Sequence, residues 1–384
     1  MRGRDPAEQH RPATPLELLF DLCFVVAVAQ AAVELHHALT EGHVGAGLVG
    51  YAAVFFAIWW AWMNFTWFAS AYDTDDVPYR LLTLLQMGGV LVLAAGVPAA
   101  FEHYDFTVVV IGYVLMRIGL VAQWLRAAAE HPNGRTTALW YAGGIAVAQV
   151  GWIARLWAPG VWAGITFAAL VVAELAVPAW AEYRGQMTSW HPKHIAERYG
   201  LFTIIVCGEV ILATLNAVHT AMANGLSVSV VLVAAGGLAL VFGLWWIYFT
   251  GAGAELHTLR RALTWGYGHY VVFAAIAALG AGIEVALDTI EHHAHLTVQQ
   301  AALTIAVPVV VVLLAVAWLH RLTHTVAGCD VLLVVTGAAL VLVLALGAPV
   351  LGIGGAVVGM ALAVAGTLAA NLVVSARRQA GGAT

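Results

Sequence analysis

Three ionisable residues of this sequence lie deep inside long apolar stretches, where an unpaired charge is costly. Arg117, Glu174 and Glu209 each stand near the middle of such a stretch. In a lipid bilayer, ionisable side chains usually face the protein interior, pair with one another, and mark the path of an ion or solute. The charge balance predicts that Arg117 pairs with Glu174 or with Glu209. Such a pair can line a transport path or only fix helix packing, and the sequence leaves both interpretations open.

A second polar pattern runs along the stretch that contains Glu209. His194, Arg198, Glu209 and Asn216 are separated by 4, 11 and 7 residues, which places them on one face of an α-helix. We expect this face to line either a hydrated path or another helix. The residues predicted to form a transport path are Arg117, Glu174, Glu209, Gln30 and Asn216. The residues predicted to surround its cytoplasmic mouth are Glu17, Asp21, His194, Glu197 and Arg198.

The third pattern is an acidic loop, which consists of Asp73, Asp75, Asp76 and Arg80. Carboxylate oxygens are the ligands that Mg²⁺ prefers, and a bound Mg²⁺ can hold a phosphate. This favours, as an alternative function, an intramembrane enzyme that acts on a lipid phosphate or diphosphate. A second acidic cluster would normally face the first, but the corresponding later loop offers only Glu255 beside His257. A simpler alternative is that the aspartates bond to Arg80 or cap the next helix.

A fourth set combines carboxylates and imidazoles near the end of a later apolar stretch. Its members are Glu284, Asp288, His292 and His295, at spacings of 4, 4 and 3 residues. On one helical face these groups could coordinate a transition metal or respond to pH. A solvated, histidine-rich loop is the alternative interpretation.

The composition predicts that membrane helices position these residues. Of 384 residues, 62% are hydrophobic and only 10% are charged, whereas a soluble domain carries about a quarter charged residues. Apolar runs of about twenty residues, long enough to cross a bilayer as helices, recur along the chain. The sequence therefore predicts an all-α, polytopic membrane bundle of about twelve transmembrane helices. The predicted spans are 15–37, 43–70, 78–101, 105–126, 136–157, 160–183, 194–218, 226–252, 261–290, 297–321, 329–348 and 350–375.

The distribution of basic residues predicts the orientation of these spans. Of the sixteen Lys and Arg residues, all but Arg117, Arg155 and Arg198 fall on one side of the predicted topology. Loops on the cytoplasmic side carry the excess of Lys and Arg in membrane proteins. We therefore expect a multi-pass protein of the cell membrane, with both termini in the cytoplasm.

The chain also shows signs of an internal duplication at an offset of about 180 residues. Residues 20–30 align with 199–209, so Gln30 becomes the neutral counterpart of Glu209. An even number of spans in each half predicts two parallel six-helix repeats, a common organisation of transporters. Chance likeness between apolar helices is the alternative. The predicted boundaries are an N-terminal cytoplasmic segment 1–14, repeats 15–183 and 184–376, and a tail 377–384.

Three ordered motifs give the chain a resemblance to a known family. They are Thr14–Leu22 (TPLELLFDL), Asp73–Arg80 (DTDDVPYR), and Glu197–Thr203 (ERYGLFT) continuing to Gly208 and Glu209. On these motifs the chain resembles the bacterial low temperature requirement A family over nearly its whole length. The resemblance implies an integral membrane protein and brings no substrate or mechanism with it.

The functional prediction from the residues is a transporter or channel for a small solute or ion, which passes through a polar path between the two repeats. The alternatives are the lipid-phosphate enzyme, or a sensor or scaffold that moves nothing. No cofactor is expected. The expected partners are membrane lipid and the transported solute or ion, and the absence of a basic cluster gives no reason to expect nucleic acid. The sequence leaves the oligomeric state open.

Overall fold

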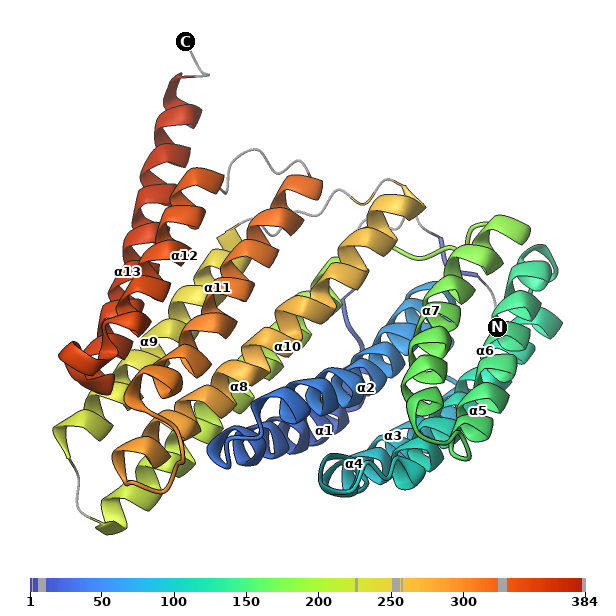
Figure 1. The fold of residues 1–384 in the computed structure, drawn as a ribbon. Helices are drawn as coiled ribbons and strands as arrows, with labels where there is room; N and C mark the ends of the chain where they lie inside the picture. Colours follow the sequence, from blue (N-terminus) through green and yellow to red (C-terminus); the bar gives the residue numbers. More distant parts are fainter. Residues whose placement is uncertain are drawn as a thin grey trace. The chain divides into compact units, whose positions relative to one another are not determined.

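In the computed structural model, the part of the chain that is described is helical, with short connecting loops and no strand (Figure 1). The described residues are 1, 3–5, 12–224, 227–250, 256, 258–323 and 330–381. Glu255 and His257 of the sequence analysis lie outside them. The prediction of an all-α membrane bundle is confirmed: eleven helices of the described chain are long and apolar enough to cross a membrane. A further apolar helix, α12 (Val331–Leu346), has 16 residues and is shorter than the others.

The chain divides into two compact units. The first unit comprises Met1–Gln30 and Ala53–Ile195, and the second comprises Ala31–Ala52 and Ala196–Thr384. The helices shared between the units are α1 (Pro15–Thr40), α2 (Val44–Tyr72) and α8 (Pro192–Asn224). The hairpin between α1 and α2 therefore packs with the second unit, where the Tyr51 hydroxyl donates to the Ala274 carbonyl at 2.7 Å. Whether the two halves are duplicates stays a prediction.

The other helices of the first unit are α3 (Val77–Ala95), α4 (Val97–Glu102), α5 (Thr107–Glu130), α6 (Arg135–Arg155) and α7 (Val161–Arg184), with a 3₁₀ turn at Pro132–Gly134. Helices α3, α5, α6 and α7 pack in that order, each against the next (Figure 1). The predicted span 78–101 is broken at Gly96. Pro98 explains the break, because proline has no N–H for the carbonyl four residues earlier and its ring clashes with it.

The second unit contains α9 (Val228–Thr250), α10 (Leu259–Ile290), α11 (Val298–Leu322), α12 and α13 (Ala348–Gly381), together with most of α8. Helix α10 packs against α11, and α13 lies beside α9, α11 and α12 (Figure 1). Helix α13 contains a kink at Gly352, whose φ of 70° lies in the left-handed region that glycine adopts without a steric penalty.

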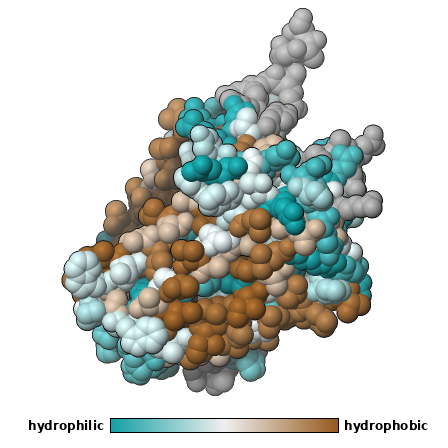
Figure 2. Space-filling model, turned by 90° about the vertical axis from the view of Figure 1, so that its right-hand side faces the viewer, coloured by the Kyte–Doolittle hydropathy of each residue, from teal (hydrophilic) through white to brown (hydrophobic). Residues whose placement is uncertain are grey.

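Large apolar side chains remain exposed along the helices, as expected for a surface that faces lipid. Val350, Trp157 and Val49 have exposed fractions of 90%, 75% and 68%. Figure 2 shows hydrophobic residues spread over the visible face. Such a surface would be unfavourable in water, and it suits the hydrocarbon layer for which the helix lengths are adequate.

Candidate functional site

The carboxylate of Glu174 lies midway along α7 in the first unit and is fully buried. Four neutral side chains from three other helices donate to it. The donors are Trp60 Nε1 at 2.8 Å, Tyr113 Oη at 3.0 Å, Trp152 Nε1 at 3.1 Å and Gln149 Nε2 at 3.2 Å. Buried polar groups are tolerated when their hydrogen bonds are satisfied, so these donors can hold the carboxylate without a water shell.

Arg117 supplies the positive charge beside this carboxylate. It lies one turn after Tyr113 on α5, and its Nη2 donates to the Tyr113 oxygen at 2.5 Å and lies 3.7 Å from Glu174 Oε2. Both side chains of the ion pair are 1% exposed. Of the two carboxylates predicted for Arg117, the structure therefore pairs it with Glu174.

The guanidinium of Arg117 is only partly satisfied. Its Nε and Nη1 atoms are buried and have no hydrogen-bond partner within the described chain. A buried donor without an acceptor costs free energy, about 1–3 kcal/mol and more for a charged group. The pair therefore leaves these two nitrogens, which carry three N–H groups, free to meet a further acceptor.

Sequence reasoning missed the four neutral donors around Glu174. Gln149 gave a usable signal, because an amide inside an apolar helix needs a polar partner. Trp60, Tyr113 and Trp152 gave none, since aromatic residues in membrane helices more often pack than donate. Only the packing of α2, α5 and α6 against α7 identifies them.

Two of the residues predicted for the cytoplasmic mouth, Glu17 and His194, lie in contact. His194 Nε2 lies 3.2 Å from Glu17 Oε1, and both side chains are buried. The other oxygen of Glu17 accepts from the N–H and the hydroxyl of Thr14, at 2.8 and 3.0 Å, while the Glu17 N–H donates back to Thr14. This reciprocal pattern is a capping box. Glu17 therefore helps to cap the N-terminus of α1 and also contacts His194.

The other mouth residues are divided between the units. Asp21 is fully buried in the first unit and accepts from Trp62 Nε1 at 2.7 Å. In the second unit, Arg198 is fully buried and Glu197 is half-buried. The predicted arrangement of all five residues around one opening stays a prediction.

The polar residues on one face of α8 become more exposed along the helix. His194 and Arg198 are buried, Glu209 is half-buried and Asn216 is exposed. Glu209 lies within electrostatic range of Glu284 on α10, in the second unit. Gln30, its predicted counterpart, is half-buried on the part of α1 that belongs to the first unit.

Each aspartate of the acidic loop faces an arginine. Asp75 forms a two-point pair with Arg80, with both N···O distances 2.8 Å. The predicted alternative of an Asp–Arg80 pair is thus found. Asp73 lies 3.9 Å from Nη1 of Arg4.

Asp76 has two structural roles. It caps α3 by accepting from the Tyr79 N–H at 3.0 Å, and it forms a two-point pair with Arg126 of α5 at 2.7 and 2.5 Å. The Arg126 hydrogen bond lowers the pKa of Asp76 to about 2, and the Arg80 hydrogen bond lowers that of Asp75. Both carboxylates are therefore ionised at neutral pH and already neutralised by guanidinium groups.

The predicted metal set is not brought together. Asp288 Oδ2 lies 2.7 Å from Nε2 of His36, and Glu284 Oε2 lies 3.8 Å from its Nδ1. His292 and His295 instead lie exposed in the loop after α10. Across the described ranges, no group of three or more His, Cys, Asp or Glu side chains could hold a metal ion. The spacing of four residues along α10 did not predict that Glu284 and Asp288 would both lie beside His36 of α1.

Comparisons with known proteins identify relatives of this chain. A protein of Rhizobium meliloti (strain 1021) named "Uncharacterized protein RA0937" is 28% identical over 263 residues, a stretch that covers 64% of this chain and 60% of that protein. The family model described as "Bacterial low temperature requirement A protein (LtrA)" matches residues 12–366. With nearly its whole length matched, this chain belongs to the bacterial low temperature requirement A family.

Proposed function

We propose that the protein moves a small solute or ion across the membrane, and that Glu174 and Arg117 lie on its path. The observation that carries the proposal is the fully buried Arg117–Glu174 pair, in which two guanidinium nitrogens have no acceptor within the described chain. Ionisable residues within membrane spans most often serve transport, proton relay or ligand binding.

The incomplete pairing supports a role in binding over a contact that only fixes packing. A structural ion pair gains most when all its donors and acceptors are satisfied. Here Glu174 has four neutral donors, so it depends little on Arg117, which keeps the three N–H groups of two nitrogens for another partner. An anion or a polar solute could bind Arg117 while Glu174 stays hydrogen-bonded.

The acidic loop gives less support to the enzyme alternative. Lipid-phosphate chemistry with Mg²⁺ would use the oxygens of Asp75 and Asp76, and these oxygens bind Arg80 and Arg126. Magnesium would have to displace two-point guanidinium pairs, which are among the stronger hydrogen-bonded contacts.

The test is flux through the purified full-length protein in liposomes. Protons, alkali cations, chloride and small organic anions are offered in turn, and we expect at least one to cross faster than in protein-free liposomes. Glu174→Gln should lower that flux at least about tenfold. Glu102→Gln, an exposed glutamate at the end of α4, is the matched control and should keep wild-type flux.

Two results would contradict the proposal. If no offered solute crosses faster than in protein-free liposomes, the sensor or scaffold alternative takes its place. If flux occurs and Glu174→Gln leaves it unchanged, the path lies elsewhere and the pair is a packing contact.

A further inference from the structure

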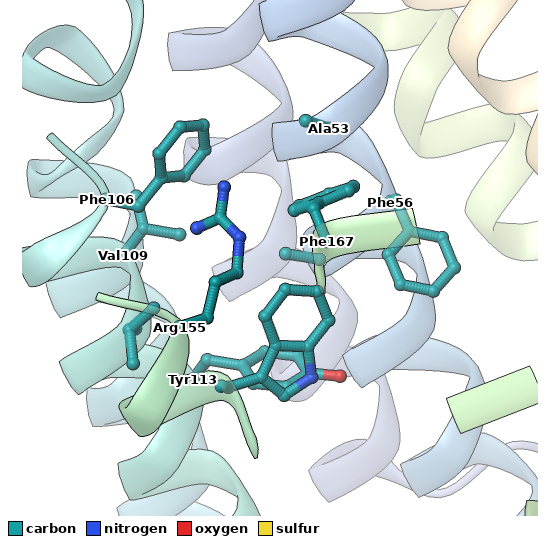
Figure 3. Close-up of a pocket in the computed structure, with 10 residues that line it drawn as sticks. Ala53, Phe56, Phe106, Val109, Tyr113, Arg155 and Phe167 are labelled. Atoms are coloured by element: carbon teal, nitrogen blue, oxygen red, sulfur yellow. The ribbon is translucent and has the colours of Figure 1, made fainter. Parts of the chain in front are cut away.

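The pocket between α2, α5, α6 and α7 of the first unit leaves no room for an organic ligand (Figure 3). Its free space is about 20 Å³, enough for about one water molecule. The Arg155 guanidinium already lies between the rings of Phe106 and Phe167, with its central carbon 5.0 Å from both ring centroids. The second unit, in contrast, brings together ionisable side chains from α1, α8 and α10.

His36 of α1 lies between two carboxylates that stand one turn apart on α10. Its Nε2 is 2.7 Å from Asp288 Oδ2, and its Nδ1 is 3.8 Å from Glu284 Oε2. The shorter distance is that of a charge-assisted hydrogen bond. All three side chains are partly buried, and we call them the His36 trio.

The positions of the two ring nitrogens favour a proton beyond those of a neutral imidazole. A neutral ring has one N–H group and one lone pair, whereas the protonated ring donates from both nitrogens. If a neutral His36 donates to Asp288, the lone pair of Nδ1 faces the Glu284 carboxylate. A proton on Nδ1 replaces this repulsion with attraction. The His36 trio is therefore complementary to one added proton.

The surroundings of the His36 trio add negative charge. Glu209 of α8 lies within electrostatic range of Glu284. Among the described residues, no Lys or Arg nitrogen lies within ion-pair distance of Glu284 or Asp288. The other imidazole on this part of α1 belongs to His37, whose ring centroid is 5.3 Å from that of His36. Three carboxylates beside these imidazoles favour the uptake of a proton.

The His36 trio lies close to the aqueous phase. His36 is one turn before the end of α1, and Asp288 is two residues before the end of α10. The segments after these helices carry the ionisable residues Glu41, His43, Glu291, His292, His293 and His295. Charged groups avoid hydrocarbon, so these segments lie in the aqueous layer. His43 lies 3.4 Å from Glu41 and His293 lies 3.5 Å from Glu291, each within its own segment.

The His36 trio also joins the α1–α2 hairpin to α10. Three further hydrogen bonds make the same connection. They run from the Tyr51 hydroxyl to the Ala274 carbonyl, from the Tyr270 hydroxyl to the Ala52 carbonyl, and from the His295 N–H to the Thr40 carbonyl, at 2.7, 2.8 and 3.0 Å. Hydroxyl and backbone donors keep their protons near neutral pH, whereas an imidazole titrates there. A change of pH therefore acts on this connection through His36.

We propose that the His36 trio is a proton-binding site, in which one proton from the aqueous phase makes His36 a cation that joins the α1–α2 hairpin to α10. The ring accepts the proton from water at Nδ1 and returns it there. Loss of the proton as the pH rises leaves a lone pair facing Glu284 and weakens the attachment. The stabilisation is thus present at low pH and disappears as the pH rises. This site lies in the second unit and does not require that the protein transport a solute.

The direct test is the protonation state of His36 in the purified full-length protein in phosphatidylcholine nanodiscs. Histidine is labelled with ¹⁵N, and the NMR signal missing from the His36→Gln variant identifies this ring. We expect both ring nitrogens to be protonated at pH 7.5, where a solvent-exposed imidazole is about nine-tenths neutral. If His36 is neutral at pH 6, or titrates as the exposed His43 does, the proposal is wrong.

Thermal unfolding between pH 6 and pH 9 measures the attachment. The wild type should melt at least about 2 °C above His36→Gln at pH 6, and this difference should disappear at pH 9. His43→Gln makes the same change at an exposed histidine of the hairpin and should leave the pH dependence unchanged. If His36→Gln does not fold, Asp288→Asn removes the other partner and should show the same loss. A difference that is equal at both pH values contradicts the proposal.

The salt composition distinguishes a proton from a metal cation as the occupant. At pH 9, sodium chloride replaces choline chloride at constant ionic strength, so that screening stays the same. The wild-type melting temperature should not change. If sodium raises it by about 2 °C or more, the His36 trio binds a cation and the proposal is wrong. Failure of these tests leaves the flux test with Glu174→Gln unaffected, so the two proposals are distinguished.

Discussion

At the scale of single residues, Glu174 and Arg117 are unequal partners. Glu174 accepts four hydrogen bonds from neutral donors, whereas Arg117 makes one hydrogen bond, to Tyr113, and lies 3.7 Å from the carboxylate. Loss of Arg117 would leave an anion that still has its donors. Loss of the Glu174 charge would leave a buried cation with no carboxylate in contact. The two single changes should therefore differ in cost.

A double-mutant cycle tests this pairing. Removing one partner of a buried ion pair typically costs about 3–5 kcal/mol, because the other charge is stranded. We expect Glu174→Gln to reach this range and Arg117→Gln to cost less. The double variant should be more stable than Glu174→Gln alone. Thermal unfolding in detergent is the measurement, with Glu102→Gln as control; additive effects of the two substitutions would contradict a direct interaction.

At the scale of elements, two glycines let α3 and α5 approach closely. A Cβ atom placed on Gly89 of α3 would lie 2.7 Å from the carbonyl oxygen of Gly112 and 2.9 Å from the backbone nitrogen of Met116, both on α5. Small residues at such crossings allow backbones to come together in membrane helices. The contact matters for the site, because α5 carries Tyr113 and Arg117.

Two neighbouring glycines of α3 provide a matched test of that contact. Gly89→Ala should destabilise the protein by about 1–3 kcal/mol, the usual range for overpacking, because backbone atoms cannot move aside. Gly88→Ala meets nothing within 4 Å and should be neutral or stabilising by up to about 1 kcal/mol, since alanine favours a helix. Thermal unfolding of both variants is the measurement. If Gly89→Ala and Gly88→Ala change the stability equally, close packing is not the reason for glycine at position 89.

At the scale of the whole molecule, the prediction concerns orientation. The excess of basic residues predicts that the loop before α3 lies in the cytoplasm and the loop after α10 outside. Single cysteines are placed at position 75 and at position 293 in a chain without Cys23, Cys207 and Cys329. An impermeant thiol reagent added to intact cells should label position 293 and not position 75. Labelling of position 75 would overturn the predicted span count.

The sequence by itself determined the class of the protein and the location of its membrane helices. A bilayer about 30 Å thick requires about twenty apolar residues per span, so the apolar runs alone predict the helices. The break at Gly96 was missed, although Pro98 is a local signal for it. Burial of certain charged residues could also be predicted from the sequence, because charged side chains in apolar runs avoid lipid. The structure buries Glu17, Asp21, Arg117, Glu174 and Arg198.

Only the tertiary structure decided which groups meet. It pairs Arg117 with Glu174 rather than with Glu209. It also pairs Asp76 with Arg126, and His36 with Asp288. These partners lie between 50 and 252 residues apart in the chain. Helical periodicity fixes which residues share a face, but the packing of one helix on another selects the partner across that face. A charged residue in an apolar run therefore predicts that a polar partner exists, but only the tertiary structure identifies that partner.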